Sequence, residues 1–569
     1  MNTISTKSRR DNQKSAGVTP ATAERNTQMS ERAWQLSAAS VLVLGAFLRL
    51  FKLTLVPLHH DEGVNGNFLL SLVRDGKYFY DPQNYHGPTL YYFSAIIPWI
   101  VRFFGGKVAG DKYGLTTFNI RLVTVLFGIG TIWLALCLRK RIGMIGALSA
   151  ACLIAISPGA VYLSRYFIHE SLFVFFTLGI VVAGLKYYDT GRSTYLVLAA
   201  ICAALMVATK ETWIINAPVL LLALGCTAGW FRLRDKLDSS RESDSRPIGD
   251  QLRATIDRLG GPISLLTIIL VAFAVFILVF VFFYSSFFTN YPKGVADAFR
   301  TLNLWRQRTH EHEHSWYQYA YWLVIEEGVI MLLAPLGAAI ALARADNRLG
   351  VFLSLWAFGL LTAYSIAGMS ITRLLSEILH GHITEQTYKT PWICLNFIVP
   401  LALTAGYGLN CLYEKLREAE LPWLFIPVAL VLASWSGYQF YQLNFVHYDD
   451  DVLPYVYAHT KRQLLTMLDE IDRISQKNGT GEDTGIALVS PDYWPLPWYF
   501  RDFKKVGYFQ QIVPTNEPII IGSMAQEEQL KQNYGDRYDR INSGLDENGS
   551  YPLRPGVDLL LYVRRDVKR

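Results

Sequence analysis

Cysteine and charged residues are scarce in this chain. Only 6 of its 569 residues are cysteine, and 18% are charged. All the cysteines lie inside long apolar runs and none belongs to a CxxC pair. The sequence therefore offers neither a disulfide framework nor a thiolate zinc site. Soluble proteins carry more charge, about a quarter of their residues, so this composition is not typical of a soluble protein.

Phosphate-loop and targeting signals are missing as well. The C-terminal part contains no Walker motif and no GxGxxG motif. The net charge of +6 is explained by short basic loops and requires no nucleic-acid partner. Residues 1–33 lack the apolar core of a cleavable signal peptide, and we expect them to form a disordered cytoplasmic tail.

Apolar runs near the bilayer-spanning length of about 20 residues are what the sequence has in abundance. They predict a polytopic α-helical membrane protein with about eleven transmembrane helices within residues 34–440. The predicted spans are 34–56, 118–138, 143–163, 168–186, 193–209, 211–230, 262–284, 319–343, 349–370, 391–413 and 421–440.

Basic residues predict the orientation in a plasma membrane. With the N-terminus inside, Arg139-Lys140-Arg141 and the basic loop 232–258 fall on the cytoplasmic side, as the positive-inside rule requires. Segment 88–104 is apolar and aromatic, but counting it as a span would move both basic segments outside. We therefore expect an interfacial helix there, within a first outer loop of residues 57–117.

The same parity places residues 441–569 outside the cytoplasm. A helical pattern over 451–475 is followed by strand-like runs at 485–490, 518–523 and 557–563, which predicts a small α/β domain. The aromatic run 490–502 suits either packing or stacking on a sugar ring, and we favour packing.

Ionisable side chains gather at the outer ends of the spans, where they indicate a functional cavity. Asp61 and Glu62 directly follow the first span. The other members are Arg165, His169, Glu170, Lys210, Glu211, Glu326, Glu327, Tyr388 and Lys389. Taken singly, the cations also suit contacts with headgroups, and Asp61 suits a helix N-cap. Their convergence on one side favours a shared site.

The run HEHEH at 310–314 presents alternating histidines. His310, His312 and His314 are weak candidates for a metal site, because the pattern is not HExxH and no second ligand set is identifiable. A solvated outer loop is the favoured interpretation. The sequence requires no cofactor, and a divalent metal stays open as an alternative.

The order of motifs resembles the GT-C fold membrane glycosyltransferases of the protein O-mannosyltransferase and aminoarabinose-transferase type. The shared pattern is an acidic DE pair at 61–62, His86-Gly87-Pro88, Arg121, and a Ser-Arg-Tyr turn at 164–166. Further segments are similar to a bacterial and archaeal branch of flippase-activity-associated proteins of glycosylation clusters. These segments are HHDEGVN (59–65), YHGPTLYY (85–92), TKET (209–212), TYKTPW (387–392) and DYWPLPWY (492–499).

This resemblance implies a helical membrane core with two interfacial helices in the first outer loop, and a polyprenyl-phosphate sugar as donor. Asp61 matches the family's acidic residue in that loop. The chain departs from the mannosyltransferases in having His-Gly-Pro rather than His-Pro-Pro, and its tail is not their β-trefoil. The acceptor, whether lipid, glycan or protein, is therefore left open.

The expected chemistry is an inverting sugar transfer on the extracytoplasmic side. Asp61 is the predicted base and Glu62 the residue that orients the acceptor or a cation. The donor phosphate is assigned to Arg165, Lys210 and Lys389. Other substrate contacts are assigned to His60, His86, Glu170, Glu211 and Tyr388. The alternatives are a lipid-linked sugar flippase and a non-catalytic subunit of a glycosylation complex.

Overall fold

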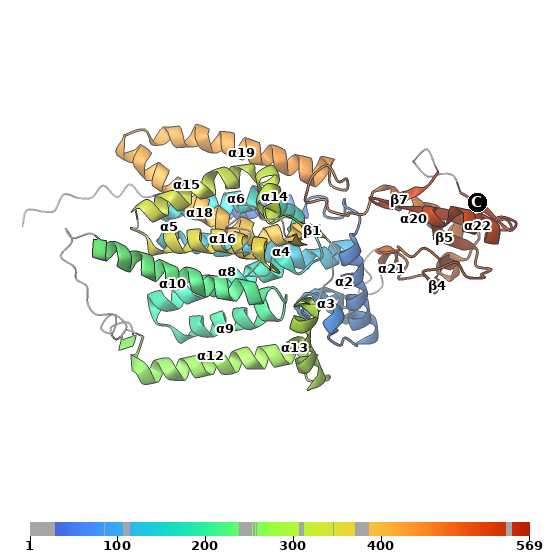
Figure 1. Cartoon of the computed structure of the whole chain (residues 1–569), viewed down its shortest axis with the longest axis horizontal. Helices are drawn as coiled ribbons and strands as arrows, with labels where there is room; N and C mark the ends of the chain where they lie inside the picture. The colour runs from blue at the N-terminus through green and yellow to red at the C-terminus, as the bar shows by residue number, and fades with distance from the viewer. Residues whose placement is uncertain are drawn as a thin grey trace, which may run out of the picture.

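The computed structural model describes residues 29–84, 86–105, 114–237, 253, 256–257, 259–306, 312–344, 346–369, 386–541 and 549–568. A long helical bundle lies beside a smaller sheet domain (Figure 1). In the described residues, eight helices are long and apolar enough to cross a membrane, or up to ten segments if each of two bent pairs is one span. The predicted tail, 1–33, lies largely outside the described residues.

The bundle helices follow the predicted spans. The eight long segments are α1 (Glu31–Leu50), α4 (Thr117–Leu136), α8 (Glu170–Thr190), α10 (Trp213–Leu237), α12 (Gly261–Tyr284), α16 (Arg348–Ile366), η3 with α18 (Pro391–Cys394, Leu395–Glu418), and η4, α19 and η5 (Pro422–Leu424, Phe425–Tyr441, Gln442–Val446). The bent pairs are α6 with α7 (Met144–Ile156, Pro158–Ser164) and α14 with α15 (Gln318–Glu326, Gly328–Arg344). The remaining predicted span corresponds to α9 (Ser193–Val207), which has 15 residues and is shorter than the usual spanning length.

The two breaks in the bent pairs meet each other. The first pair bends by 59° and the second by 113°. Glu327, at the second break, accepts hydrogen bonds of 2.8 Å from the Ser157 hydroxyl and the Gly159 backbone N–H at the first. This carboxylate satisfies donors that the start of α7 leaves open, so Glu327 joins the two broken helices.

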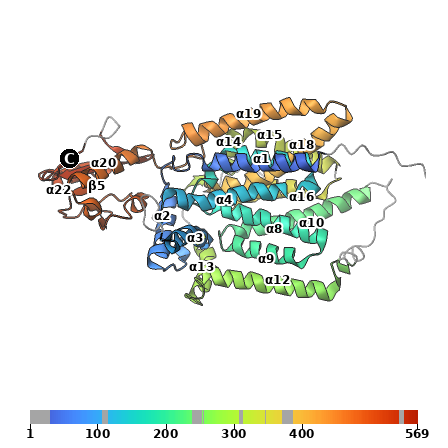
Figure 2. The same cartoon turned by 180° about the vertical axis from the view of Figure 1, so that it is seen from behind.

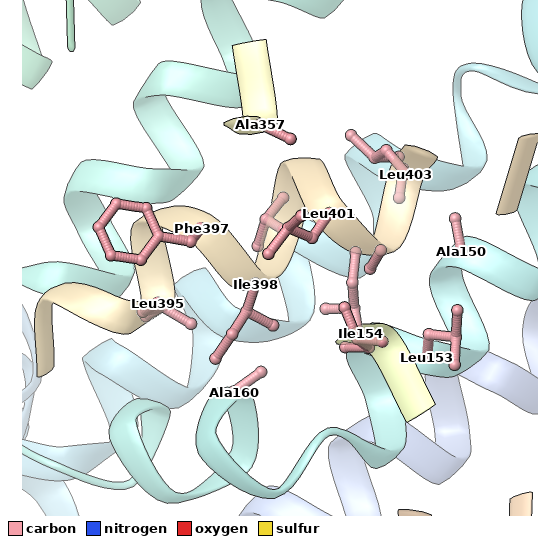
Figure 3. Close-up of a cluster of buried hydrophobic side chains, with 14 of the residues drawn as sticks. Ala150, Leu153, Ile154, Ala160, Ala357, Leu395, Phe397, Ile398, Leu401 and Leu403 are labelled. Carbon is pink, nitrogen blue, oxygen red and sulfur yellow. The ribbon is translucent and has the colours of Figure 1, made fainter. Parts of the chain in front are cut away.

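Helix α18 forms the centre of the bundle. In its membrane-spanning stretch 94% of the residues are buried inside the protein, whereas only 11% are buried in the corresponding stretch of α12. Figure 3 shows Phe397, Leu401 and Leu403 of α18 among side chains of α6 and α16. A Cβ on Gly406 would lie 2.5 Å from the Gly146 carbonyl oxygen, so α6 and α18 approach as closely as they do because both carry glycine.

The first loop carries short helices: α2 (His60–Leu70), η1 (Ser71–Asp75), η2 (Pro82–Asn84) and α3 (Thr89–Phe103). The helix predicted over 88–104 is thus confirmed, while its depth in a membrane stays a prediction. Helix α2 runs across the end of the bundle, between the bundle and the sheet domain (Figures 1 and 2). Its N-cap is His59, not Asp61: the His59 imidazole accepts from the Asp61 N–H, and Glu62 completes a capping box.

The C-terminal domain is a mixed sheet with helices on both faces. Its strands are β3 (Gly485–Leu488), β4 (Lys505–Tyr508), β5 (Ile519–Ser523), β6 (Tyr538–Arg540), β7 (Tyr551–Arg554) and β8 (Val557–Arg564), in the order β4-β3-β5-β8-β6 with β7 also paired to β8. Strands β3, β4 and β5 are parallel, and β8 is antiparallel to β5. The α/β class and the three predicted strands are confirmed.

Helices α20 (Gln463–Lys477) and α22 (Glu527–Tyr534) pack on opposite faces of this sheet, because alternate strand residues contact each helix. Burial on both faces explains why the central strands are almost continuously apolar. The helix predicted over 451–475 begins later, at Gln463. Pro454 lacks a backbone donor, and the residues after it form turns.

The sheet domain is docked on the first loop through the aromatic run. Trp498, in α21 (Leu496–Tyr499), is fully buried in a cluster with side chains of α2 and α3. The Tyr499 hydroxyl accepts from the Leu58 N–H at 2.9 Å, and Arg74 pairs with Asp502 at 2.5 Å. These residues of the run therefore pack against protein.

Candidate functional site

A cavity of about 810 Å³ opens where the bundle meets the first loop. Its size is in the range of small-molecule sites. It is lined by the start of α2, by Gln83, Asn84 and His86, and by the α7–α8 and α9–α10 turns. The rest of the lining comes from β1 and β2 (Glu313–His314, Thr387–Tyr388) with residues beside them, from α13 (Lys293–Arg306) and α14, and from the end of α16. Its ionisable lining residues are His60, Asp61, His86, His169, Glu170, Lys210, Glu211, His312, Glu313, Tyr319, Tyr364 and Tyr388.

Asp61 presents a carboxylate to this cavity. It lies in the first turn of α2, partly exposed, and the described residues give its carboxylate no hydrogen bond or ion pair. Burial alone would raise the pKa of Asp61, but neighbouring groups, when positively charged, outweigh burial and lower it. These neighbours are His59, His60, His86 and Lys210. The side chain is therefore an ionised acceptor at neutral pH.

Lys210 brings a positive charge to the cavity. Its ammonium pairs with the Glu170 carboxylate, and both side chains are almost completely buried. The α9–α10 turn that carries Lys210 is tied to the first loop by a 3.0 Å bond from the Gly87 N–H to the Thr209 carbonyl. A Cβ on Gly87 would lie 2.0 Å from the Ala208 carbonyl oxygen, which explains the glycine of the His-Gly-Pro motif.

The imidazole rings of His86 and His169 lie side by side in the cavity lining. Nδ1 of His86 lies 3.0 Å from Oε2 of Glu211, and Nε2 of His169 lies 3.0 Å from the Gly87 carbonyl oxygen. Their ring centroids are 4.8 Å apart. Within the described part of the chain, no group of three or more His, Cys, Asp or Glu side chains is arranged to hold a metal ion.

Of the HEHEH histidines, His310 lies outside the described residues. The His312 imidazole is 2.7 Å from the Tyr457 hydroxyl, and the His314 ring packs edge-on against Trp322. Burial, with the nearby Lys389 ammonium, lowers the pKa of His314. His312 and His314 thus join β1 to Tyr457, which precedes α20, and to Trp322 of α14.

Glu62 lies outside the cavity lining, although it is next to Asp61. Its carboxylate is fully buried, pairs with Arg121 at 2.6 Å, and accepts from the backbone N–H groups of His59 and Phe167. Arg121 also donates to the carbonyls of Leu53, Val56 and Pro57. This ion pair fixes the connection between α1 and α2.

Arg165 and Lys389 are not among the cavity-lining residues either. The Arg165 guanidinium donates to the carbonyls of Phe51 and Lys52, at 3.2 and 2.7 Å. The Lys389 ammonium bonds the Thr387 hydroxyl and the His314 carbonyl, so it braces β1 and β2. Burial lowers the pKa of Lys389 to about 8. The Arg165 side chain therefore does not line the cavity that Asp61 and Lys210 share, although His169 of the same turn does.

Several lining residues were not anticipated from the sequence. Asn65 donates to the Phe167 carbonyl at 3.0 Å and accepts from the Tyr91 hydroxyl at 2.9 Å. It follows Asp61 by four residues, so a helical interpretation of HHDEGVN would have placed both on one face. Trp392 and Tyr364 come from distant segments, and no local pattern points to them.

The comparisons with known proteins agree on the fold. The family model for dolichyl-phosphate-mannose-protein mannosyltransferase matches residues 95–237. No curated protein matches the sequence. ArnT from Cupriavidus metallidurans, solved with undecaprenyl phosphate bound, superposes with a TM-score of 0.58 at 12% identity, over 94% of this chain and 98% of that one. The apo Archaeoglobus fulgidus oligosaccharyltransferase gives a TM-score of 0.51 at 14% identity, over 88% and 70%.

At such low identities the likeness concerns the fold. It extends over nearly the whole chain, including most of the C-terminal domain, and the family model covers the part from α3 to α10. The architecture expected from the order of motifs is thereby confirmed. The chain is a multi-pass membrane protein with the GT-C fold, which it shares with membrane glycosyltransferases.

Proposed function

We propose that the protein is a membrane glycosyltransferase, a hexosyltransferase that takes its sugar from a polyprenyl-phosphate donor. One observation carries this: an ionised carboxylate without a partner in the described residues, Asp61, shares a cavity with a buried cation, Lys210. Sugar transfer from a lipid phosphate requires this combination. The fold neighbour that was solved with undecaprenyl phosphate bound gives independent support for such a donor.

The proposed reaction is a single inverting displacement. The Asp61 carboxylate takes the proton of the acceptor hydroxyl as its oxygen bonds to the anomeric carbon. The bond from that carbon to the phosphate oxygen breaks, and polyprenyl phosphate leaves with the electron pair. Lys210 stabilises the charge that develops on the phosphate. Because phosphate is a good leaving group, the reaction needs no strong general acid, unlike glycoside hydrolysis.

The other cavity residues receive supporting roles. Glu170 holds the Lys210 ammonium in place, and Glu211 holds the His86 imidazole. His60 and Tyr388 border the same space and are placed to contact the sugar or the acceptor. The positions of Glu62, Arg165 and Lys389 support structural roles, in place of the catalytic and phosphate roles first assigned to them.

We further infer that the cavity faces the extracytoplasmic side of the plasma membrane. The cavity uses residues 168–170 at the start of α8, whereas Arg141 pairs with Asp189 at the other end of that helix. A helix of 21 residues is about 30 Å long. The basic residues that favour the cytoplasm thus lie at the opposite end from the cavity.

The test is Asp61→Asn in purified protein, with Asp75→Asn as the matched control. Asp75 is exposed at the end of η1, in the same loop, and lies outside the cavity lining. The substrates are a polyprenyl-phosphate hexose with a radioactive sugar and a detergent extract of native membranes as acceptor. We expect release of polyprenyl phosphate to fall about 10²–10⁴-fold in Asp61→Asn only. Equal rates in both variants would refute the base assignment.

The same preparation separates transfer from transport. A transferase works in detergent, because bond chemistry needs only the cavity. Absence of transfer in detergent, combined with movement of the labelled lipid across a liposome bilayer, would contradict the proposed function and favour a flippase.

A further inference from the structure

Part of the aromatic run that leads into α21 lies beside the cavity and is less buried than the Trp498 anchor. The Trp494 ring lies 6.1 Å from the imidazole of His60, which lines the cavity. A Cβ on Gly63 would meet Pro495 and the Trp494 ring, so α2 and this loop are in direct contact. Trp494 is therefore a neighbour of the site, although it belongs to the C-terminal domain.

Trp494 is one of three aromatic residues that form a platform. The rings of Tyr493 and Trp494 are stacked, with centroids 5.7 Å apart and planes at 28°. The Tyr508 ring follows at 5.4 Å from Tyr493 and is 38% exposed. We call Tyr493, Trp494 and Tyr508 the aromatic platform. Tyr493 and Trp494 are only partly buried, in contrast to Trp498 in the same run, which is fully buried.

Polar groups border the aromatic platform. Asp492 and Arg554 form an ion pair of 2.5 Å, with side chains 46% and 19% exposed. The Gln510 side-chain amide donates to the Tyr493 hydroxyl at 3.1 Å, which leaves that hydroxyl able to donate. The Tyr508 ring is tilted by 41° against the Tyr493 ring, so the three rings form a curved aromatic surface. Partly exposed aromatic rings with carboxylate, guanidinium and hydroxyl groups beside them suit a ligand that is apolar on one face and rich in hydroxyls at its edge.

The position of the aromatic platform in the sheet domain is also typical of a ligand site. Residues 492–494 follow the end of β3, and Tyr508 is the last residue of the neighbouring parallel strand β4. Ligands of open α/β sheets bind outside the carboxyl ends of parallel strands. The docking contacts of Trp498, Tyr499 and Arg74 hold this edge in a fixed position beside α2.

We propose that the aromatic platform, with Asp492 and Arg554, binds the carbohydrate part of the acceptor; this rests on the proposed function. The C–H face of a pyranose ring carries partial positive charge and packs on the negative face of an aromatic ring. The bordering groups bond its hydroxyls. The acceptor hydroxyl is then delivered from the platform, past His60, to Asp61. The acceptor is a glycan chain or a glycan-bearing molecule, and the C-terminal domain selects it.

The test measures oligosaccharide binding by full-length protein in detergent, with a glycan array followed by saturation-transfer NMR on the bound oligosaccharides. The variants are Trp494→Ala and Tyr508→Ala. Phe509→Ala is the matched control, because Phe509 is 43% exposed, follows Tyr508 directly, and lies on the Gly507 side of the strand. Tyr508→Ala removes a partly exposed ring at an edge strand, so it serves if Trp494→Ala does not fold.

We expect wild type and Phe509→Ala to bind the same oligosaccharides, and the two platform variants to bind them about tenfold more weakly. Undecaprenyl phosphate binding, measured in the same samples, should be equal in all four proteins. No oligosaccharide binding by wild type, equal binding by all variants, or selection of peptides from a parallel peptide array would overturn the proposal. Oligosaccharide binding without undecaprenyl phosphate binding would count against the proposed donor and would still support the aromatic platform as a glycan site.

Discussion

The two faces of α2 place neighbouring carboxylates in opposite surroundings. On the face towards α4, Glu62 is fully buried, paired with Arg121 and bonded to two backbone N–H groups. On the face towards the cavity, Asp61 is partly exposed and has no hydrogen-bond or ion-pair partner for its carboxylate in the described residues. The same chemical group is thus fully satisfied at one position and available at the next.

This difference shows how the structure divides its charges between folding and chemistry. A buried charge is tolerated when it is paired and hydrogen-bonded, as Glu62 and Arg121 are. A reactive carboxylate must instead keep a lone pair for the substrate. Sequence position alone does not distinguish the two, because residues one apart on a helix point about 100° apart. The following predictions probe this division, from the largest effect to the smallest.

Glu62→Ala should have the largest effect, and on stability. Removing one partner leaves the Arg121 guanidinium buried without its counter-charge, which costs about 3–5 kcal/mol. We expect little folded protein by fluorescence-detected size exclusion, whereas Asp61→Ala should match wild type. The double variant Glu62→Met/Arg121→Leu should recover part of the loss. A Glu62→Ala protein with wild-type thermal stability would contradict the structural role.

The pair Lys210→Met/Glu170→Leu should separate folding from activity within the cavity. Because both charges are removed together, neither is left buried and unpaired, and the fold should survive. Transfer should fall about 10²–10³-fold, because the leaving phosphate loses its cation. The measurement is turnover at matched amounts of folded protein. Turnover near the wild-type value would remove Lys210 from the mechanism.

The burial of the Lys389 ammonium should make the stability of the protein depend on pH. Burial lowers its pKa from 10.5 to about 8, so the folded state loses this proton first as pH rises. Between about pH 8 and 10.5 the unfolded chain binds more protons, and stability should rise with pH by on the order of 1 kcal/mol from this residue. The difference in unfolding midpoint between wild type and Lys389→Met, at pH 8 and at pH 10, isolates this contribution. A difference independent of pH would show that Lys389 titrates normally.

Arg74→Met should have the smallest effect. It removes a partly exposed ion pair with Asp502 and a 2.6 Å hydrogen bond to the Arg501 carbonyl, both between η1 and the sheet domain. Exposed ion pairs contribute about 0.2–1 kcal/mol. We expect a small drop in the unfolding midpoint and unchanged transfer, because Trp498 still anchors the domain. A large loss of transfer would mean that docking of the domain depends on this one pair.

The sequence predicted the helices and the central strands well because their patterns are local. Long apolar runs and the turns between them are determined by consecutive residues. The predicted spans coincide with helices or bent pairs. The gathering of Asp61, Glu170, Lys210 and Glu211 on one side followed from span parity alone, and the structure brings them to one cavity.

What the sequence does not show is mainly pairing between residues that are far apart in the chain, which is not local. Arg165 was expected to bind phosphate, yet it bonds carbonyls at the end of α1, more than a hundred residues away. Glu62 was grouped with Asp61 because nothing in the sequence shows that Arg121 reaches it. The start of α20 was placed too early because the apolar pattern continued through the segment after Pro454.

The central claim is tested most directly by a structure of the protein with undecaprenyl phosphate bound. We predict that the phosphate lies in the 810 Å³ cavity, with an oxygen within about 3 Å of the Lys210 ammonium. Asp61 should then stand across the space left for the sugar, well inside a Debye length of about 10 Å. A phosphate bound elsewhere, farther than that from Asp61, would contradict the assignment of Asp61 as the base.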